Sequence, residues 1–136
     1  KGSYKLGLPE VTLGILPGNG GTQRLPALIG ASRALELMII GAPVSPEEAH
    51  RIGLVDRLYE AGELAEQTNG FARKLAASAT YAIGRIKRSV WDGIGQPLEA
   101  GLANERRNIG LLFQSADARE GFAAFTEKRS AKFIGR

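Results

Sequence analysis

The sequence predicts an α/β fold in which helices far outnumber strands, and the hydrophobic pattern is the main reason. Apolar side chains recur every three or four residues through most of the second half of the chain, as they do on one face of a helix. Only residues 3–6 and 53–59 are compatible with strands, and both segments are short. At 136 residues the chain has the length of one domain, which can bury roughly two-thirds of its unfolded surface.

Capping residues and glycines mark where several of these helices begin and end. Residues 45–48, Ser-Pro-Glu-Glu, form a capping box with proline at the first helical position. Ser32 is predicted to cap a helix that ends before Gly41 and is so apolar that we expect it to be buried on most sides. Trp91 adjoins an apolar stripe and is expected to pack. Further helices are predicted over residues 20–28, 63–77 and 80–94, from Pro97, and after a cap at residues 115–117.

The composition argues against several classes of protein. Hydrophobic residues make up 43% of the chain and charged residues 24%, and no apolar run approaches the roughly 20 residues of a membrane span. The first residues do not resemble a signal peptide, and the lack of cysteine is typical of a cytoplasmic protein. No metal site is expected, since His50 is the only histidine; we interpret it as an exposed or hydrogen-bonded helix residue.

The net charge of +4 raises the question of nucleic-acid binding. Basic residues lie along the predicted helices, and four more cluster from Lys128 to Arg136. No aromatic residues alternate with these charges as base stacking would require. We therefore interpret most of them as solvated helix faces and expect no nucleic-acid partner, although a basic end could meet the phosphates of a coenzyme A.

A single carboxylate, Glu10, stands among apolar and glycine neighbours near the start of the chain. Pro9 fixes the backbone before it, and Gly7 and Gly14 leave space on either side. Desolvation by the leucines and valine around it would favour the protonated form, which suits a general acid or base. The residues alone equally allow a turn or helix-start glutamate.

A glycine-rich turn, Pro17-Gly-Asn-Gly-Gly-Thr22, follows and opens a predicted helix. Unpaired backbone N–H groups at such a helix start can hold a water molecule or an anion. The turn lacks the Gly-Lys-Ser/Thr of a P-loop, and Gln23 stands where a dinucleotide-binding motif needs its third glycine. Nucleotide binding by either mechanism is not expected, and an ordinary tight turn stays possible.

Several segments resemble, in order and spacing, the enoyl-CoA hydratase/isomerase (crotonase) family. The longest is Leu13-Gly-Ile-Leu-Pro-Gly-Asn-Gly-Gly-Thr-Gln-Arg-Leu25, and the resemblance extends to the closing helix, Glu120-Gly-Phe-Ala-Ala-Phe-Thr-Glu-Lys-Arg129. The other segments are Gly7–Glu10, Ala34–Leu37, Ser45–Ala49 and Gly53–Asp56. The similarity covers nearly the whole chain, but it corresponds to only about the C-terminal half of a family member.

The resemblance implies a crotonase-like ββα spiral of which this chain carries the C-terminal, mostly helical part. Residues 1–60 would be the end of the spiral core, with the glutamate and the Pro-Gly-x-Gly-Gly turn. Residues 61–136 would be the helical region that assembles homotrimers or dimers of trimers. An acyl-CoA thioester is the implied substrate, and no cofactor is expected because coenzyme A is part of that substrate.

The resemblance also assigns roles to particular residues. Glu10 takes the position of a catalytic acid/base, and the backbone N–H of Gly18 takes a position that helps hold the attacking water. Phe125 and Lys128 match substrate-binding positions near the adenine end of the coenzyme. From the residues alone, Phe125 can equally belong to an apolar helix stripe, and Lys128 can be a charge that complements the helix dipole.

The same resemblance predicts what this chain does not supply. The two N–H donors for the enolate oxygen and a second glutamate would come from an N-terminal half, so the chain by itself is expected to be nearly inert. Hydration of 2-enoyl-CoA is the predicted reaction. The alternatives are double-bond isomerisation, which some family members perform with one glutamate, and a non-catalytic helical module that assembles oligomers or binds RNA.

Overall fold

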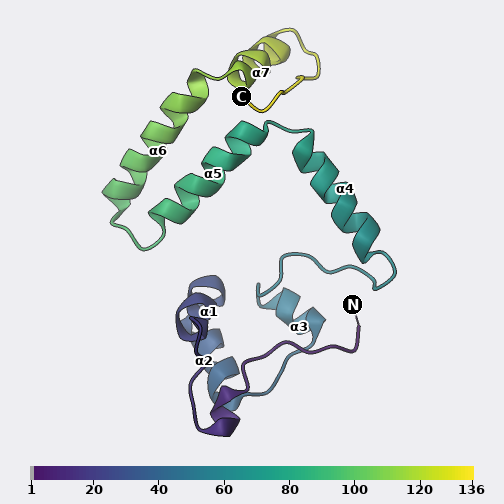
Figure 1. Cartoon of the computed structure of the whole chain (residues 1–136), viewed down its shortest axis with the longest axis vertical. Helices are drawn as coiled ribbons and strands as arrows, with labels where there is room; N and C mark the ends of the chain where they lie inside the picture. The colour runs from purple at the N-terminus through teal and green to yellow at the C-terminus, as the bar shows by residue number, and fades with distance from the viewer. Residues whose placement is uncertain (1) are drawn as a thin grey trace. The chain divides into compact units, whose positions relative to one another are not determined.

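The computed structural model describes residues 2–136, which form seven α-helices and one 3-10 helix (Figure 1). The chain divides into two compact units, one ending at Gln67 and the other beginning at Thr68. The elements are η1 (Glu10–Leu13), α1 (Gly21–Ile29), α2 (Ala31–Ile40), α3 (Pro46–Arg51), α4 (Leu64–Ala76), α5 (Thr80–Gly93), α6 (Leu98–Phe113) and α7 (Ala116–Thr126).

The first unit is built around the contact between α1 and α2. Leu25 of α1 and Ala34 and Met38 of α2 form a small buried core. Gly41 ends α2 with a φ of 67°, and a side-chain carbon at this glycine would lie 2.7 Å from Val11 of η1. The end of α2 therefore packs directly against η1, and this close approach fixes the position of the segment that carries Glu10.

The second unit contains a hairpin of α5 and α6, which lie side by side in Figure 1. A polar network joins them: Arg85 donates to Asn108 at 3.4 Å, and the Asn108 amide donates to the Asn104 side chain at 3.0 Å. Both asparagines are buried. Helix α7 follows α6 and begins with the predicted cap, because the Ser115 hydroxyl accepts from the Ala118 N–H at 3.0 Å.

Neither predicted strand forms. Of residues 3–6, only Leu6 pairs, in a single antiparallel bridge with Val44. In residues 53–59, the N–H groups of Leu54 and Val55 instead donate to the Ala49 carbonyl at 2.8 and 3.3 Å. These bonds fold the segment back onto the end of α3, so its alternating pattern reflects a turn and not a sheet.

Three predictions about helix surroundings are wrong. Helix α2 begins two residues earlier than predicted, with Gly30 and not Ser32 at its N-cap. It is also not buried on most sides, because only the face with Ala34 and Met38 packs, and Ile39 is 65% exposed. Trp91 is 70% exposed, since Gly93 approaches α6 and a residue two positions earlier points to the other side of the helix.

Local helix signals are confirmed more closely. The Ser45 hydroxyl accepts from the Glu48 N–H at 3.2 Å, so the capping box begins α3 as predicted. The Glu48 carboxylate does not complete the box, because it pairs with Arg51 instead. Across residues 2–136, no helix is both long and apolar enough to cross a lipid bilayer.

Candidate active site

Glu10 is the first residue of η1, and hydrogen bonds fix the backbone around it. The Pro9 carbonyl accepts from the Thr12 N–H at 2.9 Å and from the Thr12 hydroxyl at 2.7 Å. Gly14 closes the turn with a φ of 73°, which glycine adopts without strain, and its N–H donates to the Val11 carbonyl at 3.0 Å. The position of Glu10 is thus set by main-chain bonds and not by its own side chain.

The carboxyl group of Glu10 has a buried oxygen without a hydrogen bond. Its Oε2 is hidden from solvent and has no hydrogen-bond partner within residues 2–136. Buried polar atoms nearly always have a partner, because an unsatisfied one costs about 1–3 kcal/mol. An unsatisfied carboxyl oxygen can accept a hydrogen bond from a ligand, which a general acid or base must do.

The glycine-rich turn presents open backbone beside α1. Asn19 and Gly20 have φ values of 51° and 86°, and the Gly21 N–H donates to the Gly18 carbonyl at 3.0 Å. The Gly18 N–H donates to no main-chain acceptor in the described part of the chain. A side-chain carbon at Gly18 would meet nothing within 4 Å, so the space on that side of its Cα is open.

Glu10 and Gly18 line one cavity of about 690 Å³ within the first unit. The residues predicted to act together from the sequence are therefore brought together by the fold. Six leucines line it, and four of them, Leu8, Leu25, Leu37 and Leu54, belong to or pack against the small core of α1 and α2. Those lining leucines are Leu6, Leu8, Leu25, Leu28, Leu37 and Leu54.

Arg24 also lines this cavity, although no role was predicted for it from the sequence. It lies on α1, one turn after Gly20, where a side-chain carbon would come within 3.2 Å of Arg24 Cζ. Arg24 takes part in none of the salt bridges formed among residues 2–136. The sequence feature that could have pointed to Arg24 is its position in the Gly-Gly-Thr-Gln-Arg segment, of which only the glycines were given a role. It gives the cavity an unpaired positive charge.

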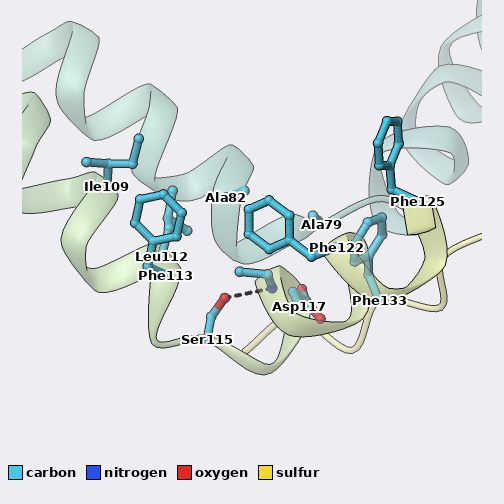
Figure 2. A pocket seen from close by; sticks show the side chains of 12 residues that line it. Ala79, Ala82, Ile109, Leu112, Phe113, Ser115, Asp117, Phe122, Phe125 and Phe133 are labelled. Atoms are coloured by element: carbon cyan, nitrogen blue, oxygen red, sulfur yellow. Dashed lines mark hydrogen bonds between the residues drawn. The ribbon is translucent and has the colours of Figure 1, made fainter.

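Phe125 and Lys128 belong to the second unit. Phe125 is 85% exposed and lies at the rim of an apolar cavity of about 600 Å³ beside α7, in which Phe113 and Phe122 stack with ring centroids 6.1 Å apart (Figure 2). Lys128 is exposed just beyond α7 and has a φ of 55°. Both side chains are accessible to a ligand.

The remaining candidate, His50, has a structural role. Its Nδ1 lies 3.0 Å from the Val55 carbonyl, a contact that helps fold residues 53–59 back onto α3. Among residues 2–136, no three His, Cys, Asp or Glu side chains cluster as a metal site would require. In the first unit, Glu10 thus lines a cavity together with Gly18 and Arg24.

The family model for enoyl-CoA hydratase/isomerase matches residues 2–136. The chain belongs to this family. It is 37% identical over 132 residues to a crotonyl-CoA hydratase of Syntrophomonas wolfei, a match that covers 97% of this chain and 51% of the relative. It is 40% identical over 121 residues to a short-chain-enoyl-CoA hydratase of Clostridioides difficile, covering 89% of this chain and 78% of the relative.

Solved structures agree with the family assignment. An enoyl-CoA hydratase from Geobacillus kaustophilus superposes with a TM-score of 0.93 at 50% identity, over 97% of this chain and 50% of that one. One from Bacillus anthracis gives 0.91 at 40% identity, over 98% and 52%. The fold is the C-terminal, mostly helical part of the α/β crotonase-like spiral, and the chain spans about half the length of the first curated relatives it matches.

Proposed function

We propose that this chain supplies the acid/base half of an enoyl-CoA hydratase, which adds water across the double bond of a 2-enoyl-CoA thioester. Two observations carry the proposal: Glu10 has a buried Oε2 without a hydrogen-bond partner, and Glu10 and Gly18 line the same leucine-containing cavity. Family membership supports the substrate class, since relatives are named for hydration of enoyl-CoA thioesters.

In the proposed reaction, Glu10 takes a proton from water as the water oxygen bonds to C3 of the substrate. The electron pair of the double bond moves to the thioester, which becomes an enolate and then takes a proton at C2 from the second glutamate, which we assign to the N-terminal half. Glu10 then releases its proton to solvent and the second glutamate regains one, so that both return to their starting states. The Gly18 N–H holds the water in place by donating to its oxygen. The enolate oxygen requires N–H donors of its own, and we assign these to the N-terminal half typical of the family.

The coenzyme part of the substrate is assigned to the second unit, with Phe125 and Lys128 near its adenine end. No further cofactor is needed, because hydration transfers no electrons. The proposed assembly is a homotrimer or a dimer of trimers. Its support is an exposed apolar stripe along α5 and its C-cap, in which Ile86, Val90 and Ile94 are 55% exposed or more. Fatty acid β-oxidation in the cytoplasm is the proposed setting.

Double-bond isomerisation is the second candidate, because it needs only the one carboxylate that this chain supplies. Glu10 is the only carboxylate among the described residues that line the cavity. One carboxylate suffices to move a proton between two carbons of an enoyl thioester, whereas hydration in this family is expected to use two glutamates. Whether the N-terminal half supplies a second acidic residue to this cavity therefore distinguishes the two reactions.

The test is turnover of crotonyl-CoA by the full-length protein, followed by loss of the enoyl-thioester absorbance. Glu10→Gln keeps the shape of the side chain but cannot transfer the proton, so we expect turnover to fall by about 10²–10⁴. Glu63→Gln, at an exposed position outside the cavity, is the matched control and should keep full activity. Circular dichroism checks that both variants fold. Normal turnover by Glu10→Gln would reject the catalytic role.

The same preparation distinguishes the second candidate when it is given a 3-enoyl-CoA. An isomerase raises the enoyl-thioester absorbance as the double bond moves into conjugation, whereas a hydratase without isomerase activity leaves it unchanged. A rise that depends on Glu10 would favour isomerisation over hydration.

A further inference from the structure

The main chain turns sharply where α7 ends, and the residue at the turn is a lysine. Lys128 has a φ of 55°, in the left-handed region that glycine normally occupies after a helix. Its N–H donates to the Phe125 carbonyl at 3.3 Å, and the Arg129 N–H donates to the Ala124 carbonyl at 3.0 Å. A side chain at such a position is strained, and strain of this kind persists where the surroundings hold it and a function uses it.

Two acidic side chains hold this turn through Arg129. The Arg129 guanidinium donates to both carboxylate oxygens of Glu120, at 2.6 and 2.9 Å, and to Glu127 at 2.5 Å. The Glu120 carboxylate also accepts from the Lys132 N–H at 2.8 Å. Glu120 on α7 thus contacts the chain on both sides of residues 130–131 and fixes the segment that follows Lys128.

The two neighbouring cations differ in what remains available to a ligand. Arg129 is occupied by two carboxylates. Lys128 takes part in no salt bridge within the described residues, and its side chain is exposed. The ammonium of Lys128 is therefore an unpaired positive charge on a main chain that is fixed at both sides, an arrangement suited to binding an anionic group.

We propose that Glu120 is a positioning residue which, through Arg129, holds the Lys128 ammonium in place for the phosphate groups of the coenzyme A substrate. This inference rests on the proposed function, because it takes the enoyl-CoA thioester as the ligand of Lys128. Glu120 does not touch the substrate in this account. Its contribution is to prevent the turn at residue 128 from relaxing.

A second acid on α7 provides the matched control. The buried Asp117 carboxylate accepts from the Ile134 and Gly135 N–H groups at 2.7 and 3.0 Å. It therefore fixes the end of the segment that follows α7, residues 128–136, which we call the tail. It makes no bond to Arg129 or to the turn at Lys128. Loss of Asp117 should loosen the tail but leave Lys128 in place. Loss of Glu120 should loosen the tail and also displace Lys128.

The experiment measures KM and kcat for crotonyl-CoA in the full-length protein. We expect Lys128→Ala and Glu120→Gln each to raise KM about fivefold and to leave kcat within about twofold, as for loss of one charge contact made outside the reacting atoms. The double variant should match Lys128→Ala alone, because Glu120 acts through that lysine. Asp117→Asn should lower thermal stability and keep the original KM.

Two results would overturn the positioning role: an unchanged KM in Glu120→Gln, or an equal rise in Asp117→Asn. If crotonyl-CoA is not turned over at all, the proposed function fails separately, and adenosine 3′,5′-bisphosphate then tests the site by calorimetry. Binding that weakens about fivefold in Glu120→Gln supports the inference. No binding by the original protein, or equal binding by both, contradicts it.

Discussion

Glu10 in the first compact unit and Glu120 in the second are surrounded in opposite ways. The Glu10 side chain has a buried oxygen with no hydrogen bond, and its position depends on main-chain bonds around η1. The Glu120 side chain accepts two bonds from Arg129 and one from the Lys132 N–H. A carboxylate whose oxygens are all hydrogen-bonded within the protein can stabilise the local structure. A carboxylate with an unbonded oxygen can accept a hydrogen bond from a ligand and exchange a proton with it.

The largest expected effect comes from removing the free carboxylate. Glu10→Leu should reduce turnover by about 10²–10⁴, as any loss of a general acid or base does. It should also raise the free energy of unfolding by about 1 kcal/mol, because it removes a buried unsatisfied oxygen and extends the leucine wall. Urea unfolding measures the second effect. Marked destabilisation by Glu10→Leu would show that this carboxylate has a structural role after all.

Asp117 is the opposite case, and its loss should cost stability instead of activity. Asp117→Asn replaces a buried carboxylate that accepts from two main-chain N–H groups by an amide, so we expect the free energy of unfolding to fall by about 2 kcal/mol. Amide hydrogen exchange should accelerate at Ile134 and Gly135. Unchanged exchange at these two amides would mean that the tail is held by other contacts, and the contrast with Glu10 would weaken.

What the sequence could predict follows from the distance between interacting residues. The caps at Ser45 and Ser115 involve bonds to residues three positions away, and both were predicted correctly. The hydrogen bond that the Ile134 N–H donates to Asp117 spans 17 residues, and no local sequence pattern predicts it. From the sequence alone, Asp117 is interpreted as part of the helix cap that begins at Ser115.

The site shows the same limit. The resemblance pointed to Glu10 and Gly18, but the cavity between them needs walls from α1, α2 and the turn after α3, and no spacing along the chain gives those. The failed strand at residues 53–59 has the same cause: its alternation was real, but no neighbouring strand pairs with it, and its N–H groups bond to Ala49 instead.

Lys128→Gly tests the strained turn in the second unit. Glycine adopts a positive φ freely, so this change should raise the free energy of unfolding by about 1 kcal/mol while it weakens coenzyme binding. Thermal unfolding and the KM for crotonyl-CoA measure the two effects on one preparation. Lys128→Ala, which removes the same ammonium but keeps the strain, is the control. If Lys128→Gly is more stable but keeps the original KM, Lys128 does not bind the coenzyme and serves only as a charge at the helix end.

The smallest expected effect is the pH dependence of the Glu120 contact. Hydrogen bonds from the Arg129 guanidinium and then from the Lys132 N–H lower the pKa of Glu120 from 4.5 to about 2. Because this pKa is lowered by folding, the contact stabilises the folded chain fully above about pH 4.5 and less and less as the pH falls toward 2. The difference in thermal midpoint between the original protein and Glu120→Gln should therefore be constant from pH 7 to 5 and vanish near pH 2. A difference that persists at pH 2 would arise from packing and not from the charge.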